Sequence, residues 1–146
     1  MKREIAEAWA ANLRSGEYIQ GGGCLSDYSG GVITHCCLGV LMDMAVEEGI
    51  ATKKMPSLGY NAVYTSNYSE EYRESAGILS LREERTGTLT ETVREWAGMF
   101  SPSGAVRDGV IVGKDGYTYR GLANANDNGV SFAEIADFIE ENYRNL

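Results

Sequence analysis

The sequence has no long uninterrupted run of apolar residues. Residues 1–16 alternate charged and apolar side chains, whereas a signal peptide or a membrane-spanning helix needs a continuous hydrophobic segment. We therefore expect a cytoplasmic protein without a membrane partner. Positive charge is also scarce, because 13 basic side chains face 21 acidic ones and the net charge is −8. Such a chain repels the phosphate backbone, so we do not expect a general nucleic-acid binder.

Metal ligands are few as well. The chain has one histidine, His35, and three cysteines, Cys24, Cys36 and Cys37, with no CxxC or HxxxH spacing. A structural zinc ion needs four ligands at workable spacing, and an odd number of cysteines without an export signal does not favour a disulfide framework. We expect neither a metal ion nor a cofactor.

The sequence His35-Cys36-Cys37 at the start of a predicted helix is the one segment that suggests catalysis. A thiol at a helix N-terminus has a lowered pKa and becomes a nucleophile. A cysteine hydrolase also needs a histidine facing that thiol, and His35 is its immediate neighbour in the chain. Simple burial of the cysteines is the favoured interpretation, and it indicates a protein that is not an enzyme.

Apolar residues recur every three or four positions in four segments, and this period predicts helices. The segments are about 2–14, about 36–48, about 88–98 and 131–143. Two of them begin with a Ser or Thr followed three residues later by Glu, which predicts capping boxes at Thr88–Glu91 and Ser131–Glu134.

Turn residues predict two hairpins, one with its tip near Gly30 and one at Asp115-Gly116. Between 51 and 87 no period is sustained, so we expect an irregular insertion with short strands at 62–65 and 78–81. At 146 residues the chain has the length of one domain. The sum is a single α+β domain over 1–146, with about four helices packed on a small, mainly antiparallel sheet.

Two sets of polar residues are candidates for ligand binding. Asn124, Asn126 and Asp127 occupy an Asn/Asp/Gly-rich segment before the last helix, where amides and a carboxylate suit a sugar, a base edge or a phosphate. The same composition also suits a tight turn that satisfies its own backbone. Guanidinium groups can clamp phosphates and tyrosines can stack on bases, although arginines among glutamates also form ordinary surface ion pairs. This second set consists of Arg82, Arg85, Arg107, Arg120 and Tyr64.

Four blocks of the sequence together resemble a set of small phage and prophage proteins. They are NLRSGEYIQGGGCL, THCCLGVLMDMAVEEG, LTETVREWAGM and LANANDNGVSFAEIADFIEENY, and their order is more specific than any one block. The likeness covers about half of the chain and leaves out 55–85. It implies a protein made in the cytoplasm of an infected or lysogenic bacterium, and it carries no catalytic or binding residue over to this chain.

Three hypotheses about function follow from the resemblance and the residues. The first is a phage-encoded accessory protein that sequesters a nucleotide second messenger of host immunity, such as a cyclic nucleotide or a cyclic ADP-ribose-type signal, without cleaving it. We expect such a protein to be a homo-oligomer. The second is an acidic inhibitor or adaptor that binds a host defence protein directly. The third is a small hydrolase that acts through Cys36 or Cys37.

Overall fold

The computed structural model describes residues 1–55, 60–114 and 116–146. In these ranges the chain forms six α-helices, nine short strands and a final 3-10 turn at Tyr143–Asn145. In chain order the elements are α1 (Arg3–Arg14), β1 (Ile19–Gln20), β2 (Ser26–Ser29), β3 (Val32–His35), α2 (Cys37–Glu47), β4 (Thr52–Lys54), β5 (Tyr60–Asn61), β6 (Val63–Asn67), α3 (Glu70–Ala76), β7 (Arg82–Arg85), α4 (Glu91–Ala97), β8 (Ile111–Val112), β9 (Thr118–Tyr119), α5 (Leu122–Asp127) and α6 (Phe132–Asn142).

The strands form three small sheets in the described part of the chain, ordered β1-β3-β2-β5, β4-β6-β7 and β8-β9. All pairs are antiparallel except β1 with β3. The α+β class is therefore confirmed. The expectation of about four helices on one sheet was wrong, because α3 and α5 were missed and the strands divide among three sheets.

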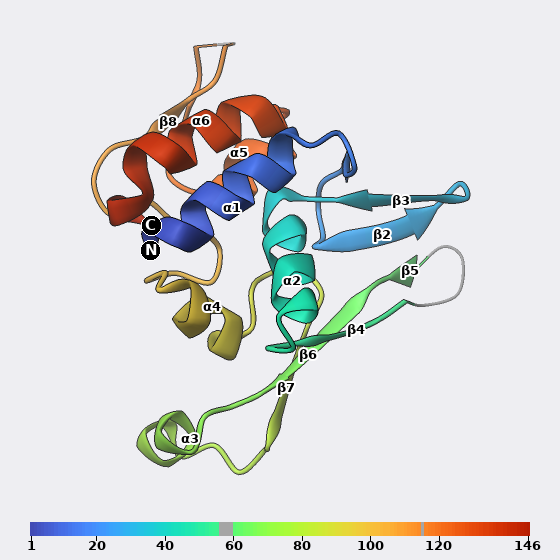
Figure 1. Cartoon of the computed structure of the whole chain (residues 1–146), viewed down its shortest axis with the longest axis vertical. Helices are drawn as coiled ribbons and strands as arrows, with labels where there is room; N and C mark the ends of the chain where they lie inside the picture. Colours follow the sequence, from blue (N-terminus) through green and yellow to red (C-terminus); the bar gives the residue numbers. More distant parts are fainter. Residues whose placement is uncertain (56–59, 115) are drawn as a thin grey trace.

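Helices α1 and α6 lie side by side in the upper half of the molecule (Figure 1). The apolar period predicted for each produces the buried face, with Ile5, Trp9 and Leu13 from α1 and Ile135 and Ile139 from α6. Every one of these side chains is at most 8% exposed. Burial of this shared face is the main force that holds the two ends of the chain together.

Helix α2 packs at the centre of the core, and a glycine allows its close approach to the preceding loop. The indole nitrogen of Trp9 donates to the carbonyl oxygen of Cys37 at 2.9 Å, which ties α1 to α2. The carbonyl oxygen of Leu25 accepts from the amide of Cys36 at 3.1 Å. A Cβ atom on Gly39 would lie 1.7 Å from that same oxygen, so only glycine fits there.

Local signals at the helix ends were informative. Ser131 and Glu134 form the predicted capping box of α6, with both reciprocal hydrogen bonds present. The corresponding prediction for α4 was wrong by two residues, since Thr90 rather than Thr88 is the N-cap and accepts from the amide of Val93. The Thr88–Glu91 pair therefore makes no capping box.

The segment 51–87 is more regular than expected. The strand predicted at 62–65 overlaps β6, whereas the strand predicted at 78–81 was wrong, because these residues form the connection between α3 and β7. Helix α3 is capped by Ser69 at its start and by Gly77 in the left-handed conformation at its end, and it buries none of its residues. Figure 1 shows β6, α3 and β7 projecting away from the helical body.

The first hairpin is confirmed, because β2 and β3 pair up to Ser29 and Val32 around Gly30 and Gly31, both with positive φ. Strands β8 and β9 pair as the second hairpin, although Asp115 of its expected turn lies outside the described residues. Among the described residues, no helix combines the length and the apolar character that crossing a membrane requires.

Candidate functional site

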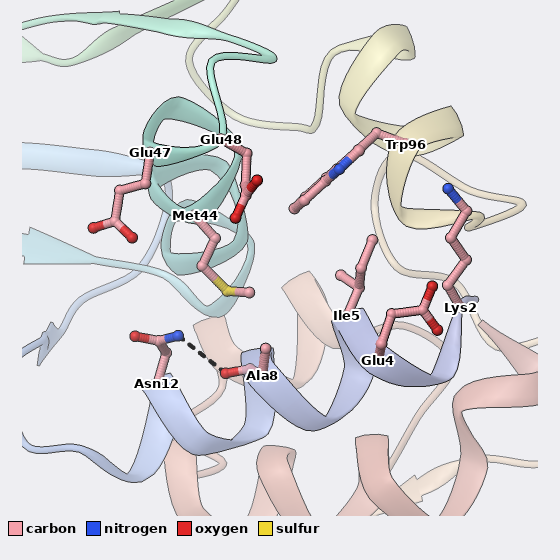
Figure 2. Close-up of a pocket in the computed structure, with 9 residues that line it drawn as sticks. All are labelled: Lys2, Glu4, Ile5, Ala8, Asn12, Met44, Glu47, Glu48 and Trp96. Atoms are coloured by element: carbon pink, nitrogen blue, oxygen red, sulfur yellow. Dashed lines mark hydrogen bonds between the residues drawn. The ribbon is translucent and has the colours of Figure 1, made fainter.

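A groove of about 430 Å³ lies where α1, α2 and α4 meet. Its floor is apolar, with Ile5 and Met44 buried and Trp96 half-buried. Figure 2 shows the indole of Trp96 extending from α4 toward Glu48 at the end of α2. A volume of this size accommodates one or two side chains or a small molecule.

The rim of this groove is acidic. Glu4 from α1, Glu47 from α2 and Glu48 line it, and all three are exposed. Within the described ranges, none of these carboxylates forms an ion pair, whereas Asp137 and Glu140 on the surface of α6 both bind Arg14. Among the described residues, the rim therefore carries three negative charges that are not engaged in ion pairs.

Two further polar residues lie at opposite ends of the groove. Lys2 stands at the end nearest α4 and is the single cationic residue among the described lining residues. At the other end the side-chain amide of Asn12 donates to the carbonyl oxygen of Ala8 at 3.0 Å, as the dashed line in Figure 2 marks. This bond uses an N–H group of Asn12, so the groove offers mainly hydrogen-bond acceptors to a ligand.

A second groove of about 370 Å³ lies along β4, β6 and β7. It is polar, and its lining includes Lys54, Thr65, Arg82 and Glu84. In the described part of the chain neither Lys54 nor Arg82 forms an ion pair. Its charged lining thus differs from that of the first groove: Lys54 and Arg82 lie with one carboxylate, Glu84, whereas the first groove has three carboxylates and Lys2.

Asp43 of α2 lies at the centre of a partly buried polar cluster that sequence reasoning missed. Its carboxylate accepts from Lys53 Nζ at 2.8 Å and from the Tyr64 hydroxyl at 2.5 Å, and His35 Nε2 lies 3.0 Å away. Burial raises the pKa of Asp43, but the three hydrogen bonds and the charge of Lys53 outweigh burial and lower the pKa below its usual 3.8. The cluster joins α2 to β3, β4 and β6.

A family model described as "Domain of unknown function (DUF8296)" matches residues 1–143. The chain belongs to the DUF8296 family. Neither the curated proteins nor the solved structures compared with it gave a match. For this DUF8296 chain, inference about function therefore rests on the geometry of its own residues.

Asn126, a predicted ligand residue, is a structural clamp in the DUF8296 chain. The Asn/Asp-rich segment is helix α5 rather than a turn, and Asn126 is 4% exposed. Its side-chain oxygen accepts from the amide of Cys37 at 3.1 Å and from Gln20 Nε2 at 3.2 Å. Its side-chain nitrogen donates to the carbonyl oxygen of Gly21 at 2.7 Å. Asn126 thus satisfies a free N–H group at the start of α2.

Asp127 and Asn124, which lie beside Asn126 in α5, make different contacts. The Asp127 carboxylate accepts from the amide of Gly23 at 2.9 Å, which holds the glycine-rich loop against α5. The side chain of Asn124 is exposed, and its backbone oxygen accepts from the side chain of Asn128 at 2.8 Å. The side chains of Asn126 and Asp127 therefore bond mainly to residues 20–37 and not, as a self-satisfied turn would require, to the backbone of their own segment.

The predicted phosphate-binding arginines do not converge. Arg82 and Arg85 lie on β7, and Arg85 pairs with Glu83 at 2.7 Å. Arg107 stacks on the ring of Phe100, 4.6 Å from its centroid, and Arg120 is exposed beside β9. In Figure 1, β7 and the segment that leads to β8 lie at different ends of the molecule. Tyr64 is buried and its hydroxyl is bonded to Asp43, so its ring is not on the surface for stacking on a base.

The cysteines lack the features of a nucleophile. Burial raises the pKa of the Cys36 thiol to about 11, and burial also raises the pKa values of Cys37 and Cys24. His35 is engaged with Asp43 and packs edge-on against Tyr18. Among the described residues, no group of three or more His, Cys, Asp or Glu side chains is placed to hold a metal ion.

Proposed function

We propose that this DUF8296 protein is a non-catalytic binding protein that holds a basic, amphipathic segment of a partner protein in the groove between α1, α2 and α4. One observation carries the proposal: Glu4, Glu47 and Glu48, all without ion-pair partners among the described residues, surround an apolar floor that includes the half-buried indole of Trp96.

The groove matches such a segment in two ways. An apolar side chain of the partner gains the burial of its surface against Ile5 and Met44. A cation beside it gains attraction from the rim carboxylates, and the net charge of −8 steers a basic partner toward the protein. Amphipathic segments that lie in grooves between helices are a recurrent mode of recognition.

The setting of this interaction is part of the proposal. The likeness to phage and prophage proteins supports a protein that acts in the cytoplasm of an infected bacterium, and it makes a host defence protein the partner that we propose. An acidic groove that covers a basic segment of such a protein would block the surface with which that segment acts. The chain would then be an inhibitor or adaptor.

The proposal is tested by titrating isotope-labelled protein with two amphipathic peptides that share one apolar face, one cationic and one anionic on the polar face. The chain has two tryptophans, and their indole N–H signals report separately on the groove and on the core. We expect the cationic peptide to shift the signal of Trp96 while the fully buried Trp9 stays unchanged. Equal binding of the anionic peptide, or an unmoved Trp96 signal, would contradict the proposal.

Sequestration of a nucleotide second messenger is a second candidate function, and the polar groove along β4, β6 and β7 favours it. Lys54 and Arg82 form no ion pair with any described residue, and Thr65 lines the same groove. The expectation of a homo-oligomer belongs to this candidate.

A thermal-shift panel of cyclic nucleotides and ADP-ribose cyclisation products tests it, since selective binding to the native state raises the melting temperature. We expect the active compound to be recovered intact after heat denaturation, and its shift to be lost in the Lys54→Gln/Arg82→Gln double variant. If no compound in the panel raises the melting temperature, this candidate function is excluded.

A further inference from the structure

We infer that the groove recognises an arginine of the partner, whose guanidinium stacks on Trp96 and donates to Glu48. This inference rests on the proposed function and specifies its chemistry. Trp96 supplies the aromatic ring, Glu48 lies at the tip of the indole in Figure 2, and both residues line one groove.

The polar groups of the groove favour a ligand with many hydrogen-bond donors. Ionised Glu47 and Glu48 can accept but not donate hydrogen bonds, and one of the two side-chain N–H groups of Asn12 is already bonded to the carbonyl oxygen of Ala8. A guanidinium carries five N–H donors in a planar fork that matches a carboxylate, whereas an ammonium carries three donors on a single nitrogen. Arginine therefore satisfies more of the lining than lysine does.

The apolar floor adds to this preference. Ile5, Met44 and Trp96 offer no strong hydrogen-bond acceptor to replace the water that a cation loses on entering. A guanidinium is more weakly hydrated than an ammonium and stacks flat on an indole, so it loses less hydration free energy on entering the groove. A methylated ammonium is normally held by a cage of several aromatic rings, and Trp96 is the sole aromatic residue among the described residues of the lining.

Lys2 sets the position of the arginine along the groove. Its side chain extends toward α4 in Figure 2, and its ammonium repels a second cation at that end of the groove. Glu47 and Glu48 at the end of α2 have no cation beside them in the described part of the lining. The guanidinium therefore lies between Trp96 and the end of α2.

The test uses three peptides on one amphipathic scaffold, in which all cations are arginine, all are lysine or all are replaced by neutral citrulline. Isothermal titration calorimetry measures their affinities for the full chain. We expect the arginine peptide to bind roughly ten-fold more tightly than the lysine peptide, from the combined gain of stacking and bidentate bonding. The citrulline peptide keeps the shape and the stacking but loses the charge, so it should bind most weakly.

Protein variants localise the effect. In Trp96→Leu the preference for arginine over lysine should fall to about two-fold, since the apolar contact stays and the aromatic face is lost. Trp96→Phe keeps an aromatic ring and should retain an intermediate preference for arginine. It serves as a second variant in case the leucine variant misfolds. Glu48→Gln should weaken binding of the arginine peptide. Glu71→Gln on the remote helix α3 removes an equal charge and should leave that binding unchanged.

The outcomes separate the two ideas. Equal affinity for arginine and lysine peptides in the unmodified protein would overturn the arginine inference while leaving the proposed function in place. Absence of binding by either cationic peptide would overturn both. A preference for arginine that survives in Trp96→Leu and in Glu48→Gln would place the arginine elsewhere and overturn the inference.

Discussion

The interior and the groove between α1, α2 and α4 both place polar side chains beside apolar ones, but they differ in how those polar groups are satisfied. In the interior, Asn126 bonds to Gln20, Gly21 and Cys37, and the partly buried Asp43 bonds to Lys53, Tyr64 and His35. At the groove, the rim carboxylates have no ion-pair partner among the described residues. Physical chemistry explains both states, because a buried polar group without a partner is costly and an exposed one is solvated.

The difference separates residues that specify the fold from residues that remain free for a ligand. A polar side chain whose bonds are all internal has nothing left to offer a partner. An exposed carboxylate remains partly solvated when it pairs with a cation, so it loses little hydration and can bind one at little cost. Substitutions in the interior should therefore change stability, and substitutions on the rim should change binding.

The largest loss of stability is expected where α2 touches the preceding loop. In Gly39→Ala the new Cβ atom would meet the carbonyl oxygen of Leu25 at 1.7 Å, and backbone has to move to relieve it. We expect about 3 kcal/mol or more of destabilisation, measured by urea unfolding. Gly87→Ala is the control, since a Cβ there meets nothing within 4 Å, and its stability should stay near that of the unmodified protein.

The next loss is expected at the clamp between α5 and α2. Asn126→Ala leaves the amide of Cys37 and the carbonyl oxygen of Gly21 without their bonds, and we expect about 2–3 kcal/mol of destabilisation by the same measurement. Asn124→Ala removes an exposed side chain from the same helix and should change stability little. Equal effects of the two substitutions would show that Asn126 is no clamp.

The contrast between local signals and long-range bonds such as those of Asn126 also explains which parts of the fold were predictable from the sequence. The helices α1, α2 and α6 were predicted because their signals are local: a repeated apolar spacing, a glycine stop and the capping box at Ser131. Helix α5 was missed because Asn and Asp are poor helix formers, and its conformation depends on bonds between Asn126 and residues about a hundred positions away. Helix α3 was missed because it buries no face and so shows no apolar period.

The groove was even harder to predict from the sequence than these helices. Trp96 was visible as one apolar residue of a short helix, and Glu48 as the end of another helix, but nothing local connects them. Folding brings them together from α4 and α2, against Ile5 of α1. The Asp43 cluster has the same origin, since Lys53 and Tyr64 reach Asp43 from two strands of a sheet whose pairing the sequence did not reveal.

A smaller and pH-dependent effect is expected at Asp43. Its pKa in the folded protein lies below 3.8, so its contribution to stability is complete above that pH and is lost as the pH falls through the lower, folded value. Asp43→Asn should cost about 2 kcal/mol at neutral pH, because it leaves the ammonium of Lys53 partly buried without a carboxylate. Acid titration of the unfolding free energy should be less steep below pH 3.8 in the variant, and an unchanged profile would contradict this role.

The smallest effect on stability, and the sharpest test of the comparison, is expected at the rim. Glu47→Gln/Glu48→Gln removes two exposed charges without ion-pair partners among the described residues, so the melting temperature should stay close to that of the unmodified protein. Binding of the cationic peptide should weaken by roughly five-fold or more, and the loss should shrink as salt screens the remaining charges. Glu71→Gln/Glu74→Gln on α3 is matched in charge and exposure and lies in the projecting segment. If that control weakens binding equally, net charge rather than the groove attracts the peptide; if only the rim variant does, the unpaired carboxylates are where the partner binds.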